Sequence, residues 1–242
     1  MMDIVTRSQP MYENGLLGKA TGGILHPGGL DLTKQLLRMC NLLPHACILD
    51  VGCGIGSTVE HLLGADRQVV GIDRSGLLLQ QGVARHPGLP LACGRVKFLP
   101  LASNWLDAVL AECSLSAMSD IEDALAEFRR VLHVGGCLAL SDIYARDSRG
   151  IPALRMLTLT CGLRDVLTED ELASKLQAHG FEIIVWEDHS ESLKYLAAQL
   201  ILTYGSLNEF WKSSEPGGPS ANIQAAVQQA KLGYYLLVAK RV

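Results

Sequence analysis

Residues 48–57 read ILDVGCGIGS, and this stretch decides the fold. A short apolar run enters Asp50, and glycines follow at positions 52, 54 and 56. The pattern predicts a buried strand that ends in a tight glycine turn, with a helix beginning near Ser57. In a doubly wound sheet such a turn lies at the carboxyl ends of the strands, where ligands bind and helix amides attract an anion.

Asp50 narrows the kind of ligand. A carboxylate at the mouth of the turn would repel a pyrophosphate, and the glycine spacing departs from the GxGxxG fingerprint of dinucleotide-binding turns. A ligand with a carboxylate for the amides and a cation for Asp50 fits better, and the methionine part of S-adenosylmethionine has both.

A second acid, Asp73, ends the next apolar run, QVVGID. An acid at the tip of the second strand accepts hydrogen bonds from ribose hydroxyls. Asp73 therefore indicates a nucleoside, which NAD would also supply, and Asp50 favours S-adenosylmethionine over a nicotinamide cofactor.

Outward from this stretch, apolar runs alternate with helical patterns. The runs occupy residues 46–52, 68–73, 91–99, 106–113, 137–145, 181–188 and 234–242. This alternation predicts an α/β fold with a doubly wound, mostly parallel seven-stranded sheet whose last two strands pair antiparallel at the edge. We also expect a helix from Asp31 to Leu43, stopped by Pro44, and a capping box at Thr168 and Glu171.

Two segments lie outside the alternation. Residues 1–30 are rich in glycine and are predicted to form an N-terminal lid segment before a main domain of residues 31–242. A helical insertion is expected at about 190–232, before the last strand. We expect this insertion to cap the acceptor pocket or to form the contact of a homodimer.

The composition excludes several classes of protein. The 242 residues are 48% hydrophobic and 19% charged with a formal net charge of −4, so a basic face for nucleic acid is not expected. Neither a membrane span nor a secretory leader is evident, which predicts a cytoplasmic protein. The seven cysteines form no CxxC pair, so neither a zinc site nor any other metal site is predicted.

Four motifs in order, ILDVGCGIG, GIDRS, LDAVLAECSL and RVLHVGGCLALSD, resemble those of the class I S-adenosylmethionine-dependent methyltransferases. The resemblance covers about residues 31–188 and implies a Rossmann-like enzyme that uses S-adenosylmethionine and releases S-adenosylhomocysteine. It implies methionine contacts at Asp50, Gly52 and Gly54, ribose contacts at Asp73, and adenine contacts at Arg95 and Val96, although the family often has Asp where Arg95 stands. We add the neighbouring Cys53, Arg74 and Glu112 to the predicted cofactor site.

The acceptor is expected to be a small molecule. The segment after the fourth strand, AECSLSAM, lacks the Asn-Pro-Pro-Tyr motif of enzymes that methylate nucleic-acid amino groups. Methyl transfer by in-line displacement depends mainly on alignment and exclusion of water. The alternative from another class is a catalytically inactive nucleoside-binding protein that acts through partners.

Three residues are candidates for the chemistry at the acceptor. AECSLSAM and CGLRDVLTEDEL resemble segments of arsenite methyltransferases, in which a Cys of each binds trivalent arsenic, and here these are Cys113 and Cys161. His26, in ILHPGG, is a candidate general base in the lid segment. The alternative for both cysteines is a structural role.

Overall fold

The computed structural model describes residues 11–65, 67–118, 120–157, 162–214 and 220–242. Seven strands form one mixed sheet in the order β3-β2-β1-β4-β5-β7-β6. The strands are β1 (Cys47–Val51), β2 (Gln68–Asp73), β3 (Leu91–Cys93), β4 (Leu106–Glu112), β5 (Leu132–Ala145), β6 (Phe181–Asp188) and β7 (Leu232–Arg241). Neighbours from β3 to β5 are parallel, whereas β7 runs antiparallel to both β5 and β6. The predicted fold class is confirmed.

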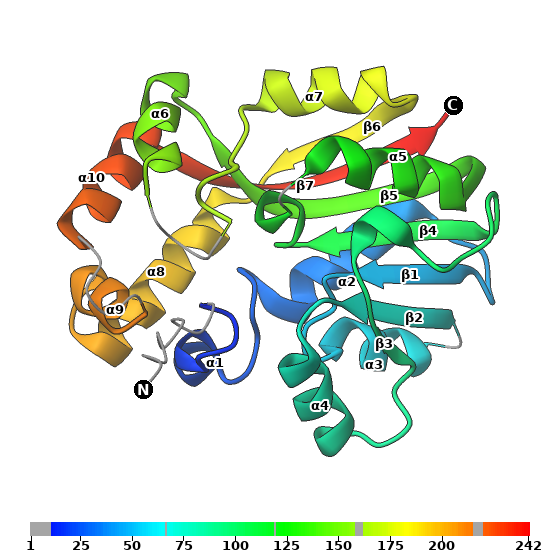
Figure 1. The fold of residues 1–242 in the computed structure, drawn as a ribbon, viewed down its shortest axis with the longest axis horizontal. Helices are drawn as coiled ribbons and strands as arrows, with labels where there is room; N and C mark the ends of the chain where they lie inside the picture. The colour runs from blue at the N-terminus through cyan, green and yellow to red at the C-terminus, as the bar shows by residue number, and fades with distance from the viewer. Residues whose placement is uncertain (1–10, 66, 119, 158–161, 215–219) are drawn as a thin grey trace, which may run out of the picture.

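Helices cover the two faces and the carboxyl-terminal end of the parallel strands (Figure 1). They are α1 (Leu16–Thr21), α2 (Gly29–Cys40), α3 (Ser57–Leu63), α4 (Gly76–Arg85), α5 (Ile121–Val131), α6 (Ile151–Arg155), α7 (Glu169–Ala178), α8 (Ser190–Tyr204), α9 (Leu207–Ser214) and α10 (Ser220–Ala230). The predicted capping box is present at the start of α7, where Thr168 and Glu171 each bond the other's backbone amide.

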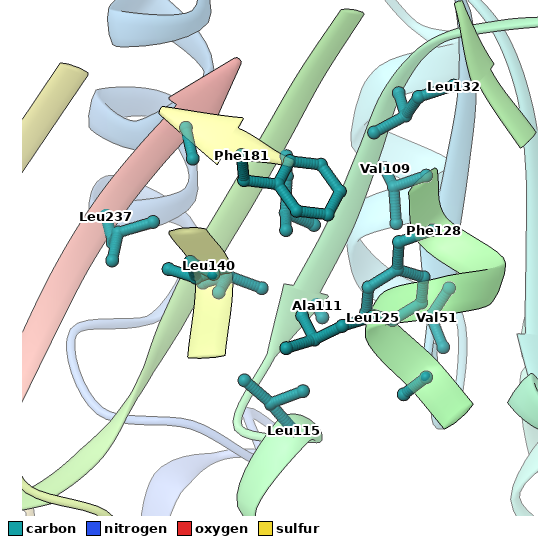
Figure 2. Close-up of a cluster of buried hydrophobic side chains, with 14 of the residues drawn as sticks. Val51, Val109, Ala111, Leu115, Leu125, Phe128, Leu132, Leu140, Phe181 and Leu237 are labelled. Atoms are coloured by element: carbon teal, nitrogen blue, oxygen red, sulfur yellow. The ribbon is translucent and has the colours of Figure 1, made fainter. Parts of the chain in front are cut away.

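Alternate strand residues face opposite sides of the sheet and build two cores. Val109 of β4 packs in the cluster beneath α5 and α7, whereas its neighbour Leu110 packs in the cluster beneath α2 and α3. Figure 2 shows part of the first cluster, in which Phe128 and Leu125 of α5 lie against the strand residues. This double-sided burial explains why the strands read as continuous apolar runs.

Several element boundaries differ from the prediction, and two of them bear on the site. Helix α2 ends at Cys40 rather than at Leu43, because Asn41 adopts a left-handed conformation (φ 48°), which Asn tolerates as a helix terminator. The third strand covers only Leu91–Cys93, and the chain continues as the 3₁₀ turn Val96–Phe98. Strand β3 is therefore a short edge strand.

A separate layer lies at the carboxyl ends of the parallel strands, where Figure 1 shows α1, α8 and α9 gathered together. Leu17 of α1, Leu200 of α8 and Phe210 of α9 form a small buried cluster of their own. The Tyr204 hydroxyl of α8 also donates to the Leu16 carbonyl at 2.7 Å. We call α1, α8 and α9 the cap layer.

Among the described residues, no helix combines the length and the apolar character needed to cross a membrane. The same residues contain no group of three or more His, Cys, Asp or Glu side chains placed to hold a metal ion.

Candidate functional site

A cavity of about 320 Å³ lies at the carboxyl ends of β1, β2 and β4, beneath the N-terminal segment. It brings together every predicted cofactor residue, although these come from four separate parts of the chain. The lining includes Asp50, Gly52, Cys53, Gly54, Asp73, Arg74, Arg95, Val96 and Glu112. His26 and Cys113 line the same cavity.

The glycine turn is held against the neighbouring strands. The Gly52 amide donates to the Ile72 carbonyl at 2.8 Å, and Gly52 has a positive φ of 75°. A Cβ at Gly52 would lie 2.4 Å from Cβ of Ser114, too close for any rotamer change to relieve. Gly56 also has a positive φ of 75° and is the N-cap residue just before α3. The sequence needs glycine here both for backbone conformation and for close approach.

Asp73 fastens the turn to β2. One carboxylate oxygen accepts the Gly54 amide at 2.8 Å, and the other accepts the Ser75 amide at 2.7 Å. Each carboxylate oxygen has a further lone pair, so Asp73 can still accept ligand hydroxyls from the cavity that it lines.

Asp50 is a buried carboxylate without a hydrogen-bond partner among the described residues. Its side chain lies at the end of β1 and the residue is 3% exposed. Burial, and then the neighbouring Glu112 and Asp73, raise the pKa of Asp50 well above its usual range. A cation in the cavity would remove this penalty.

The Glu112 carboxylate accepts hydrogen bonds that the sequence did not indicate. The Thr33 hydroxyl of α2 donates to one oxygen at 2.7 Å, and the Thr58 hydroxyl of α3 donates to the other at 2.8 Å. All three residues are buried. Glu112 therefore ties the two helices to the cavity floor, and no local motif could predict this contact because its members lie far apart in the chain.

The cavity is closed on one side by the segment around α1. Tyr12, Glu13, Ile24, Leu25 and His26 line it from this segment. Among the described residues, none of α8, α9 or α10 lines the cavity; α8 and α9 instead pack against α1. The insertion thus supports the segment that closes the cavity rather than forming a wall itself.

Cys113 lies at the end of β4 with a positive φ of 49°. Its sulfur lies 3.4 Å from the Tyr234 hydroxyl, which donates to Ser141 Oγ at 3.0 Å. Burial and the nearby Asp142 raise the pKa of the Cys113 thiol well above its usual range. At neutral pH the side chain is a thiol rather than a thiolate. The other predicted arsenic ligand, Cys161, lies outside the described residues.

Comparison with known proteins finds a methyltransferase domain. Residues 49–140 match the family model described as a methyltransferase domain. The demethylmenaquinone methyltransferase of Corynebacterium urealyticum is 27% identical over 176 residues, which cover 64% of this chain and 76% of that protein.

Solved structures extend the likeness over nearly the whole fold. The crystal structure of the [4+2]-cyclase SpnF aligns with a TM-score of 0.72 and 28% identity, covering 96% of this chain and 93% of that one. Phosphoethanolamine N-methyltransferase 2 of Haemonchus contortus, solved with phosphomonomethylethanolamine and S-adenosylhomocysteine, aligns with a TM-score of 0.70 and 14% identity, covering 95% of this chain and 57% of that one. With the glycine turn and its two acids in place, these matches support a class I S-adenosylmethionine-dependent methyltransferase.

Proposed function

We propose that the enzyme transfers the methyl group of S-adenosylmethionine to a small-molecule acceptor held in the same cavity, beneath the N-terminal segment. The observation that carries this proposal is Asp50, a buried carboxylate that lines the cavity and has no partner among the described residues. A protein keeps such a group only where something compensates its burial, and the ammonium of the cofactor's methionine part does so.

The residues around Asp50 fit the remainder of the cofactor. Asp73 accepts the ribose hydroxyls with the lone pairs that its two backbone amides leave open. The amides at the start of α3 face the methionine carboxylate. Arg95 and Val96, which follow β3, flank the adenine at the far edge of the cavity.

The acceptor binds where the cofactor does not reach. Bound S-adenosylmethionine supplies an electrophilic methyl group on a positively charged sulfur. With the methionine part at β1 and the nucleoside toward β2 and β3, the methyl group faces the segment after β4 and the N-terminal segment. Leu25 and Met118 line these two walls. They exclude water and align the nucleophile, which supplies most of the rate in a methyl displacement.

The direct test has two parts. Calorimetry with S-adenosylhomocysteine should show binding that Asp50→Asn and Asp73→Ala weaken. Transfer of labelled methyl to members of a panel of small acceptors should then be measured. Binding without transfer to any acceptor would support instead a nucleoside-binding protein that acts through partners. Absence of binding would refute the proposal.

A second candidate comes from the likeness to SpnF, because the match at 28% identity spans both chains and that protein is named for a cyclisation. Under this alternative the cavity would shape a substrate without consuming the cofactor. Measuring S-adenosylhomocysteine release per product formed separates the two reactions.

The arsenical alternative has weaker support. It needs Cys113 as a thiolate, but burial and the nearby Asp142 raise the pKa of that thiol well above its usual range and keep the sulfur protonated. If the unaltered protein bound arsenite tightly and Cys113→Ser abolished this binding, the result would favour the arsenite methyltransferase alternative.

A further inference from the structure

His26 is the imidazole that lines the cavity from the N-terminal segment. It lies between α1 and α2 and is half-buried. Its Nδ1 lies 3.4 Å from the Pro27 carbonyl, and Nε2 has no hydrogen-bond partner among the described residues. A proton on Nδ1 pointing toward that carbonyl leaves the lone pair of Nε2 free, which is the arrangement of a neutral imidazole able to accept a proton.

The positive charges around the cavity lie away from His26. Among the described lining residues, the Lys and Arg side chains are Arg74, Arg95 and Lys97. All three follow β2 or β3, at the edge of the sheet, and Lys97 is paired with Asp123. Within the described parts of the N-terminal segment and of the chain after β4, the lining therefore offers no Lys or Arg side chain to a phosphate or carboxylate.

Those two walls are mainly apolar. Leu25 and Leu30 come from the N-terminal side, and Ala117 and Met118 come from the turn after β4. Such a lining favours an acceptor with a large apolar surface and few polar groups.

The other proton acceptors on this side are engaged, with one exception. Glu112 already accepts two threonine hydroxyls, and the Cys113 thiol is held beside Tyr234. Asp120 is exposed and caps α5 through the Asp123 amide. Glu13 is the exception, but a carboxylate is a much weaker base than an imidazole toward a hydroxyl at neutral pH.

We infer that the acceptor is an uncharged, largely apolar molecule with a hydroxyl group, and that His26 is the general base that takes the hydroxyl proton. This inference rests on the proposed methyl transfer. The O–H bond breaks as its proton passes to Nε2 of His26, and the oxygen's electron pair forms the new bond to the methyl carbon. The bond between methyl and sulfur breaks, its electrons stay on sulfur, and S-adenosylhomocysteine leaves as a neutral thioether. The imidazolium then loses its proton to water.

The activity test uses acceptors of one size that differ in their reactive group. The probes are 2-naphthol, 2-naphthylamine, 2-naphthoate and 2-naphthyl phosphate, each incubated with labelled S-adenosylmethionine and the full-length enzyme. We expect label to enter 2-naphthol in preference to the others. His26→Gln should lower kcat for 2-naphthol by about 10²–10⁴-fold, with little change in KM or in S-adenosylhomocysteine affinity.

The pH profile separates a base from a structural histidine. Activity of the unaltered enzyme should rise with pH, because only the neutral ring accepts a proton. His26→Gln should lose this limb of the profile. His86→Gln is the matched control, because His86 is exposed at the end of α4 and does not line the cavity; it should keep both the rate and the profile.

A second measurement needs no acceptor. Nitrogen-15 spectra of the histidines in the S-adenosylhomocysteine complex should show His26 neutral with its proton on Nδ1, as identified by loss of the signal in His26→Gln. A proton on Nε2 would overturn the inference, as would preferred methylation of the phosphate or the carboxylate, absence of label in 2-naphthol, or an unchanged rate in His26→Gln. Failure of the unaltered enzyme to bind S-adenosylhomocysteine would instead refute the proposed function itself.

Discussion

The two sides of the cavity are built by different means. The cofactor side is centred on the glycine turn, whose backbone is held by Ile72 and Asp73 within the sheet itself. The acceptor side is assembled from the N-terminal segment and the turn after β4, and it is supported by the distant helices α8 and α9. From this difference we predict that cofactor binding depends on the sheet, whereas acceptor choice depends on a layer added to it.

The largest effect should come from crowding the glycine turn. In Gly52→Ala the new Cβ would lie 2.4 Å from Cβ of Ser114, in a backbone conformation with φ 75°. We expect a loss of about 2–4 kcal/mol of unfolding free energy, measured by denaturant titration, and no detectable S-adenosylhomocysteine binding.

Gly135→Ala is its control. Gly135 has a similar φ of 80°, but nothing lies within 4 Å of its added Cβ. It should cost only about 1 kcal/mol from backbone strain. Equal losses in the two variants would show that close approach at the turn contributes nothing.

The next effect should come from Asp50. Asp50→Asn should weaken S-adenosylhomocysteine binding by about 3 kcal/mol, because the ligand ammonium then loses its buried counter-charge. The same change should stabilise the ligand-free protein at neutral pH. Burial raises the folded-state pKa of Asp50, so its contribution to stability is full at low pH and is lost as pH rises through that raised pKa.

Melting temperature against pH tests both halves of this prediction. As the pH rises above the usual carboxyl range, the melting temperature should fall less in Asp50→Asn than in the unaltered protein. Saturating S-adenosylhomocysteine should also make this fall smaller in the unaltered protein, because the ammonium of the ligand favours the ionised form of Asp50. A ligand-independent pH profile would remove Asp50 from the site.

Asp73→Ala should have a smaller effect on binding, about 1–3 kcal/mol, from loss of charge-assisted hydrogen bonds to the ribose. Part of the loss is indirect, since Asp73 also holds the amides of Gly54 and Ser75. Calorimetry with adenosine and, separately, with S-adenosylhomocysteine distinguishes the direct ribose contact from this indirect effect, because adenosine has the ribose but no methionine part. An unchanged affinity for both ligands would exclude the ribose contact.

The contrast between the two sides also explains what the sequence could predict. The alternation of strands and helices, the glycine turn and the position of Asp73 follow from short local patterns: apolar runs, glycines and the residue that ends a strand. The Glu112 contacts with Thr33 and Thr58 have no such signature, because they join three separate segments. The early end of α2 at Asn41 was missed because Pro44, a stronger stop signal, lies nearby.

The helical insertion at about 190–232 could be predicted only in part, for the same reason. Its helices were predictable from periodicity, but their partner was not. Apolar residues such as Leu200 and Phe210 are compatible with a wall of the cavity, a dimer contact or the packing against α1 that the structure shows. The homodimer stays a prediction, which sedimentation can test.

The smallest effect should come from a substitution that weakens the cap layer alone. The Tyr204 hydroxyl bonds the Leu16 carbonyl at 2.7 Å and so joins α8 to α1. Tyr204→Phe keeps the ring packed on Phe210 but removes the hydroxyl that donates to that carbonyl, which should cost about 1 kcal/mol. Tyr195→Phe on the same helix is the matched control, because Tyr195 is 66% exposed and its hydroxyl makes no hydrogen bond among the described residues. We expect Tyr204→Phe to speed proteolysis within residues 22–29, to raise KM for the acceptor, and to leave S-adenosylhomocysteine affinity within about twofold, since the turn that holds the cofactor belongs to the sheet. If Tyr204→Phe weakened S-adenosylhomocysteine binding as much as it raised KM for the acceptor, the cofactor side and the acceptor side would not be independent. The proposed division between the sheet and the cap layer would then be wrong.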